Sequence, residues 1–184
     1  MALIGQSDLE ARLGRNLTGE EISAFTIINN ALQVEIEKII GSKIESVNAS
    51  TRYFDGGLQH LPIDPCTSLS SVTLVDDDFT VYDTLDTTDY TREPINNVMK
   101  TMIRHRSGPI QAGINNIGIT AKFSIYEDTD ILNIVKDAML NYLVAEVTNS
   151  DNIKRESIEG YSIEYGSTEA KDAMSSIKEL FPRI

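Results

Sequence analysis

The residue types that carry catalysis are few in this 184-residue chain, and they stand apart from one another. The two histidines, His60 and His105, have no Cys or carboxylate nearby at the spacing of a zinc site. His105 lies between Arg104 and Arg106, whose charge disfavours an imidazolium. We interpret both histidines as parts of a solvated face or of a strand end.

Catalytic motifs are missing as well. The sequence contains no Gly-x-Ser-x-Gly, no phosphate-cradling glycine loop and no His-Glu-x-x-His. The single Cys66 has no neighbour in sequence that would lower its pKa. It cannot form an internal disulfide, so the fold does not depend on an oxidising compartment. We therefore predict that the protein is not an enzyme and has no catalytic residue, no metal site and no cofactor.

The acidic run Asp76-Asp77-Asp78 offers a different kind of chemistry. Calcium needs several oxygens converging from fixed positions, commonly with a glycine turn and a later bidentate Glu. No Glu follows at that distance and Phe79 interrupts the run, which favours a solvated acidic loop. The functional alternative is electrostatic, because carboxylates repeated around a ring would repel DNA phosphate. The channel-lining or partner-facing residues of this loop would be Asp76, Asp77, Asp78, Asp83 and Asp86.

The composition excludes several classes of function. The chain has 28 acidic and 16 basic residues, a formal charge of −12, whereas nucleic-acid binding by charge neutralisation needs a Lys/Arg surface. Acidic membrane faces are poor partners for the same reason. No apolar run approaches the ~20 residues of a membrane helix, and the first residues lack the features of a signal peptide. We expect the protein to fold in a cytoplasm.

Helices are predicted near both ends of the chain. Ser7 or Asp8 can cap a short helix over 9–13. Thr18 and Glu21 have the spacing of a capping box for a long helix that stops at Gly41. The apolar arc of this long helix is wider than one packed face needs. Its main stripe contains Ile22, Phe25, Leu32, Ile36 and Ile39, and a second set contains Ile27, Ile28, Ala31 and Val34.

A second long helix is predicted over about 130–147, capped by Asp128 or Thr129. It is apolar over much of its girth, so we expect it to be buried on several sides. A last helix starts at Ser167 or Thr168 and ends near Phe181.

The middle of the chain has the alternating pattern of strands. Alternation over 47–53, followed by a turn at 55–57, predicts a hairpin with 58–61, after which Pro62 and Pro65 should stop regular pairing. Residues 76–89 should form a solvated loop or a hairpin with an exposed tip. Further strands are predicted at 69–75, 98–104 and 117–125, and a short strand or hairpin at 157–165.

These elements define an α+β fold, a helical scaffold of two long helices and short N- and C-terminal helices with an inserted antiparallel β module. We expect a single domain over 1–184, in which 46–126 form the β module and 167–184 a C-terminal segment.

Residues 153–165, Ile-Lys-Arg-Glu-Ser-Ile-Glu-Gly-Tyr-Ser-Ile-Glu-Tyr, resemble a signature of the head–tail connector (adaptor) proteins of tailed phages. As in that family, the motif follows a long apolar helix and precedes a short C-terminal one. Upstream, the stretch from Thr51-Arg52-Tyr53-Phe54 through Leu61-Pro62 and Pro65 to Leu69-Ser70-Ser71-Val72 resembles two family strands and their proline-bounded link. Asp89-Tyr90 fits a further family pair. The chain departs from the pattern at Glu159 and in having no proline at the start of the second long helix.

The resemblance implies a structural subunit made in the host cytoplasm and placed in the neck of the virion. Subunits would form a ring, expected to be a dodecamer, beneath the portal protein. The ring would extend the DNA channel, let dsDNA pass without specific binding and offer a platform for the next stopper or tail protein. The C-terminal segment would dock on the portal, with Ile177, Leu180, Phe181 and Ile184 as apolar anchors. A helix packed on its own domain is the competing interpretation of that segment.

Two other functions remain open at this point. One is a stopper or a tail-completion (terminator) protein of the same neck, and the other is a small hydrolase or metal-binding enzyme.

Overall fold

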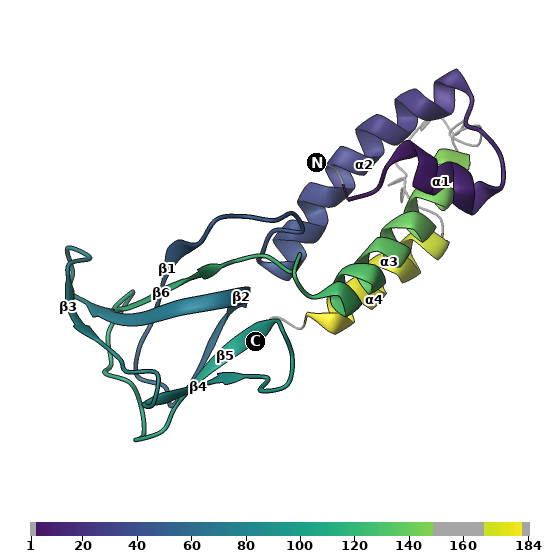
Figure 1. Cartoon of the computed structure of the whole chain (residues 1–184). Coiled ribbons are helices and arrows are strands. Elements are labelled where there is room, and N and C mark those ends of the chain that lie inside the picture. Colours follow the sequence, from purple (N-terminus) through teal and green to yellow (C-terminus); the bar gives the residue numbers. More distant parts are fainter. Residues whose placement is uncertain (1–2, 149–167, 182–184) are drawn as a thin grey trace, which may run out of the picture. The chain divides into compact units, whose positions relative to one another are not determined.

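The computed structural model describes residues 3–148 and 168–181, in which four helices and six strands form the predicted α+β fold (Figure 1). The described residues divide into two compact units. One contains the helices and the other contains the strands, with the boundaries at Ile39/Ile40 and Leu132/Asn133. None of the described helices is long and apolar enough to cross a membrane.

The helical unit begins with α1 (Gln6–Leu13) and α2 (Gly19–Ile40). Helix α1 ends at Gly14, whose φ of 69° is left-handed, as the sequence predicts. Its N-cap is Gly5, and the prediction of Ser7 or Asp8 was wrong. The reason is that the Asp8 carboxylate accepts the Gly5 N–H at 2.9 Å and the Lys136 ammonium at 3.1 Å, which fixes Asp8 inside the first turn.

Helix α2 confirms both predicted ends. Thr18 and Glu21 form the capping box reciprocally: the Thr18 N–H donates to Glu21 Oε2 at 2.8 Å, and the Glu21 N–H donates to Thr18 Oγ1 at 3.3 Å. Gly41, with φ 79°, ends the helix. The buried face of α2 consists of Phe25, Asn29, Leu32, Ile36 and Ile40.

Helices α3 (Thr129–Thr148) and α4 (Thr168–Leu180) are the other two. Asp128 caps α3, because its Oδ1 accepts the Ile131 N–H at 3.2 Å. The same carboxylate accepts the Met99 N–H through Oδ2 at 3.2 Å. The buried side chains of α3 are Val135, Ala138, Met139, Leu143, Ala145 and Val147.

The sheet unit has the strand order β1-β6-β2-β5-β4, with β3 paired to β2 outside this path, and every pair is antiparallel. The strands are β1 (Ser50–Phe54), β2 (His60–Val75), β3 (Val81–Thr84), β4 (Tyr90–Glu93), β5 (Lys100–His105) and β6 (Ile117–Lys122). Strand β6 carries the cleanest alternation in the sequence and pairs with both β1 and β2. Its residues Ile117, Ile119 and Ala121 are fully buried in the core of this unit.

The predicted hairpin between 47–53 and 58–61 was wrong. β1 pairs with β6, and the first part of β2 pairs with β5. The segment at Asp55-Gly56-Gly57 does not reverse the chain locally, because the Gly56 and Gly57 N–H groups donate to the carbonyls of Gly113 and Ile110 in a distant loop, at 2.9 and 3.0 Å. Its backbone hydrogen bonds therefore go to a partner that local sequence does not reveal.

Regular pairing does stop at Pro62 and Pro65, as expected, although the strand itself continues. Both lie inside the 16-residue strand β2. The ladder with β5 shifts register between Pro62 and Cys66, and the ladder with β6 starts at Thr67. The prolines therefore occupy the region where β2 exchanges one partner for another, and irregular pairing there accommodates a missing N–H. Figure 1 shows β2 running beside β5 first and reaching β3 at its far end.

Candidate interface surfaces

The groups that could have suggested catalysis do not gather into a site. His60 stands opposite Arg104 in the β2–β5 register, and the His105 Nδ1 lies 2.8 Å from the Gly108 carbonyl oxygen. Cys66 is fully buried, and this burial raises the pKa of its thiol to about 12. Within residues 3–148 and 168–181, no group of three or more His, Cys, Asp or Glu side chains could hold a metal ion. The remaining candidates for function are exposed surfaces that could contact a partner.

The acidic run forms the tip of the β2–β3 hairpin, one of the two alternatives predicted. Asp76 organises the tip: its Oδ1 accepts the N–H groups of Asp78 at 3.1 Å and Thr80 at 2.8 Å, and its carbonyl accepts the Phe79 N–H at 2.9 Å. Asp77 and Asp78 are exposed. One carboxylate of the turn thus accepts backbone hydrogen bonds, and the next two are exposed to solvent.

Asp83 and Asp86 follow the tip in the sequence, and both are exposed. Asp83 Oδ1 accepts the Thr84 N–H at 2.8 Å, and the Asp86 carbonyl accepts the Asp89 N–H at 2.9 Å in the turn before β4. All five predicted acidic residues are thus exposed in one hairpin and the turn that follows it. Whether they line a channel or face a partner stays a prediction.

Exposed aromatic rings lie beside these carboxylates. The Tyr53 and Phe79 rings have centroids 4.5 Å apart, and 39% and 50% of their residues' surfaces remain exposed. Val81 and Tyr82 of β3 are exposed by 53% and 52%. We call the pair Tyr53 and Phe79, whose rings are in contact, the hairpin patch. Exposed apolar side chains scattered singly are ordinary on a protein surface, but a contiguous group rimmed by polar residues is typical of an interaction site.

Two backbone features build the hairpin patch. Gly118 stands opposite Tyr53 in the β1–β6 register, and a Cβ there would lie 2.6 Å from Thr73 Oγ1 and 3.4 Å from the Tyr53 ring. Phe79 has a φ of 58°, which is unfavourable for a bulky side chain. Sequence reasoning missed this patch, although a glycine inside the alternating stretch 117–125 is a signal for close approach.

Three consecutive basic residues, Arg104, His105 and Arg106, lie where β5 ends, and they face different sides of the β4–β5 ladder. Arg104 lies opposite Thr91, and Arg106 follows on the same face, its Nε 3.4 Å from Thr91 Oγ1. Between them, His105 takes the other face, as alternation requires. Arg104 has only a long ion pair, 3.8 Å to Glu93, and its side chain is 53% exposed. We call Arg104 and Arg106 the arginine edge.

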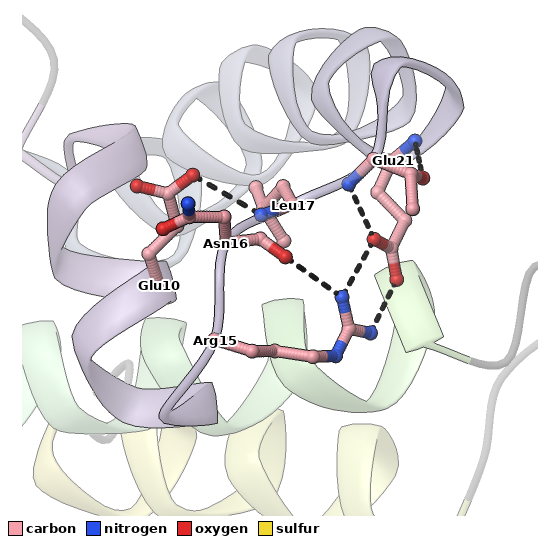
Figure 2. Close-up of polar contacts among 6 residues, drawn as sticks. Glu10, Arg15, Asn16, Leu17 and Glu21 are labelled. Carbon is pink, nitrogen blue, oxygen red and sulfur yellow. Dashed lines mark hydrogen bonds and ion pairs between the residues drawn. The ribbon is translucent and has the colours of Figure 1, made fainter.

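The exposed turn between α1 and α2 contains several side-chain hydrogen bonds. Figure 2 shows Arg15 reaching Glu21, with the Nη1 donor 2.9 Å from Oε2 and the Nη2 donor 2.6 Å from Oε1. Arg15 also donates to the Asn16 carbonyl at 3.0 Å, and Glu10 accepts the Leu17 N–H at 3.1 Å. The Arg15 guanidinium, then the Thr18 N–H, lower the pKa of Glu21 to about 2.

Two of the predicted portal anchors, one in α4 and one directly after it, are buried. Ile177 is fully buried and Phe181 is 7% exposed. The side chain of Leu180 and all of Ile184 lie outside the described residues, as does the motif at 153–165. Portal docking by this segment stays a prediction.

The second apolar set of α2 points outward in part. Ile27 is 72% exposed and Val34 is 51% exposed, and Ala31 between them is exposed as well. These three residues, spaced i, i+4 and i+7, form one apolar strip on the helix surface.

Comparison with known proteins identifies the fold. No family model and no curated protein matches the sequence. Solved structures do match it. A chain in the neck of an empty gene transfer agent (GTA) particle with C6 symmetry gives a TM-score of 0.54 at 14% identity, covering 99% of this chain and 91% of that one.

Two further structures agree. A chain in the neck of a native GTA particle with C12 symmetry gives a TM-score of 0.51 at 12% identity, over 97% of this chain and 88% of that one. A chain in the virion of a native gene transfer agent particle gives 0.51 at 16% identity, over 99% and 90%. The chain therefore has, from end to end, the fold of proteins in these phage-like particles.

Proposed function

We propose that this protein is a structural subunit of the neck of a tailed-phage-like particle and acts without catalysis. The observation that carries the proposal is the fold match to chains of GTA necks, which spans nearly the whole of both partners. A fold hosts many functions, so the match alone is an analogy. The matched regions of these neck chains cover 91% and 88% of their length, so the likeness is not confined to one element.

The subunit forms a ring in this proposal. The matched necks have C6 and C12 symmetry, and a cyclic ring closes through heterologous contacts between two different surfaces of each subunit. The exposed strip of Ile27, Ala31 and Val34 on α2 is apolar surface that such contacts would cover. Twelve copies are the expectation from the connector family.

The ring surrounds dsDNA without holding it. The formal charge of −12 opposes phosphate binding. Low affinity for DNA suits a conduit, because DNA must slide through it during packaging and release.

Within the neck we favour the adaptor position, in which the ring binds the portal through the C-terminal segment 167–184. Ile177 and Phe181 are buried, so these two side chains are not available to a partner while α4 stays packed. Either the exposed residues of α4, such as Ser175 and Glu179, make the contact, or α4 leaves its place on docking. Removing α4 would also remove buried core, so point substitutions on its exposed face test docking better than truncation.

The ring is tested by mass. We expect the purified protein, alone or with its portal, to give a species of several subunits in light scattering and a ring in electron microscopy. A protein that stays monomeric even with the portal would contradict the proposal. Images of the neck then separate adaptor from stopper or terminator, because only the adaptor ring touches the portal.

A further inference from the structure

We propose that the hairpin patch of one subunit binds the arginine edge of the next copy of the same chain. This inference deepens the ring proposed above and rests on it. The occupant is a second copy because the patch and its rim require a particular partner chemistry, and this chain carries that chemistry on another surface of the same unit.

The hairpin patch has the chemistry of an arginine receptor. Its aromatic faces are partly exposed, and the exposed carboxylates of Asp77 and Asp78 directly precede Phe79 in the sequence. A guanidinium can stack on an aromatic face while its N–H groups pair with a carboxylate, which an ammonium does less well. Residues 76–89 contain six Asp and no basic residue, so the carboxylates have no cation within their own segment.

Several cations of the described chain are already engaged in short contacts, whereas Arg92 has a cation–π contact of 6.0 Å with Tyr90 and Lys178 is exposed on α4. Arg12, Arg15, Arg52, Lys122 and Lys136 each form an ion pair of 3.2 Å or less with Asp137, Glu21, Asp64, Glu127 and Asp8 respectively. Lys100 donates to three backbone carbonyls, those of Pro94, Ile95 and Asn97. Arg104 and Arg106 are different, because one has an ion pair of 3.8 Å and the other a single long hydrogen bond to a hydroxyl.

The arginine edge and the hairpin patch are separate surfaces of one unit. Arg104 lies opposite His60, at the first residue of β2, whereas β3 pairs with Thr73–Val75 at its end. Figure 1 shows β3 and the β4–β5 pair beside different parts of β2. The exposed carboxylates of the hairpin would repel those of a second hairpin, so self-complementary pairing through the hairpin is disfavoured. Two complementary patches at different places instead produce the head-to-tail contact that closes a ring.

The strained conformation of Phe79 is explained by this contact. A left-handed φ costs a bulky residue free energy, which the contact of its ring with Tyr53 offsets only in part. In the proposed contact the ring forms one half of the stacking platform with Tyr53, held 4.5 Å away.

Charge exchange tests the contact. Asp77→Arg with Asp78→Arg reverses the hairpin, Arg104→Asp with Arg106→Asp reverses the edge, and a fourth protein combines all four changes. We expect each reversal to lower the ring fraction at fixed subunit concentration about tenfold or more, since charge pairing sets the specificity of such contacts. The combined variant should recover most of the ring fraction. Glu20→Arg with Asp130→Arg, exposed in the first turns of α2 and α3, changes as many charges as the hairpin reversal and should have little effect.

The readout is mass photometry at low and high salt, with circular dichroism to verify that each variant is folded. A wild-type protein that forms rings insensitive to both reversals would overturn this contact and leave the ring itself intact. Rings that persist in the hairpin variant while binding to another neck protein is lost would assign the patch to that protein and overturn the inference. A wild-type protein that never forms a ring overturns both proposals.

Discussion

Two exposed turns of this protein satisfy their charges in opposite ways. In the α1–α2 turn, every charge shown in Figure 2 has a partner within the turn: Arg15 is bound by Glu21, and Glu10 accepts the Leu17 N–H. In the β2–β3 hairpin, Asp76 closes the turn, while Asp77 and Asp78 point their charge at solvent beside two half-exposed rings.

The difference separates stability from assembly. A turn whose polar groups pair with one another leaves no demand for an external partner, so its residues serve the fold. A turn that presents exposed charge and half-exposed rings, and holds Phe79 at a positive φ, leaves groups available to a partner, since only the Tyr53–Phe79 contact stabilises the isolated subunit. We expect substitutions in the first turn to change the stability of the subunit and substitutions in the second to change its association.

The largest effect on stability is expected where the hairpin patch meets the sheet. Gly118→Val places a side chain 2.6 Å from Thr73 Oγ1 and against the Tyr53 ring. We expect the free energy of unfolding to fall by about 2–3 kcal/mol, the cost of overpacking, as measured by chemical denaturation. Gly19→Ala, where nothing lies within 4 Å of the added Cβ, is the control and should change little.

Phe79→Gly should separate assembly from stability. Relief of the left-handed strain, about 1 kcal/mol, offsets the loss of the Tyr53–Phe79 contact, about 0.5–1.5 kcal/mol. We therefore expect the free energy of unfolding to stay within about 1 kcal/mol of wild type. The ring fraction in mass photometry should fall severalfold. A variant with wild-type ring formation would show that the phenyl ring has no part in association.

Thr18→Ala is the converse experiment in the α1–α2 turn. It removes the hydroxyl that accepts the Glu21 N–H, and losing such a cap costs about 1 kcal/mol. Ring formation should not change at temperatures where the subunit is folded. Thr26→Ala provides a matched control, because Thr26 Oγ1 donates to the Ile22 carbonyl inside the same helix and caps nothing. Equal destabilisation by both variants would contradict the role of the capping box.

The smallest effect is a pH dependence carried by Glu21. Its pKa is about 2 in the folded chain, against an ordinary value of 4.5. A lowered pKa stabilises the fold above about pH 4.5, and that contribution is lost as the pH falls toward 2. The melting temperature of Glu21→Gln should therefore lie slightly below that of wild type at pH 6, and the two should converge near pH 2. Glu20→Gln, the exposed neighbour, should follow wild type throughout.

Local chemistry determined much of the helical unit from sequence. The Thr18–Glu21 box, the glycine ends at Gly14 and Gly41 and the Asp128 cap depend on residues within four positions of one another, so their spacing alone predicts them. The α+β class, the strand at β6 and the hairpin after β2 also follow from alternation and turn residues.

Tertiary structure alone decided which strands pair and which surfaces form. Strand β1 pairs with β6 and not with β2, the next strand in the sequence. The Gly56 and Gly57 N–H groups donate to a loop more than fifty positions later, and no local sequence pattern predicts such a partner. The short strand β4 is recognised only through its ladder with β5. The hairpin patch joins Tyr53 and Phe79 from two separate segments, and Gly118 of a third segment leaves room for the Tyr53 ring. The arginine edge forms because strand alternation places His105 on the face opposite to Arg104 and Arg106. Sequence could thus establish that the acidic tip is exposed, whereas the rings beside it and the arginines that could complement it required the folded sheet.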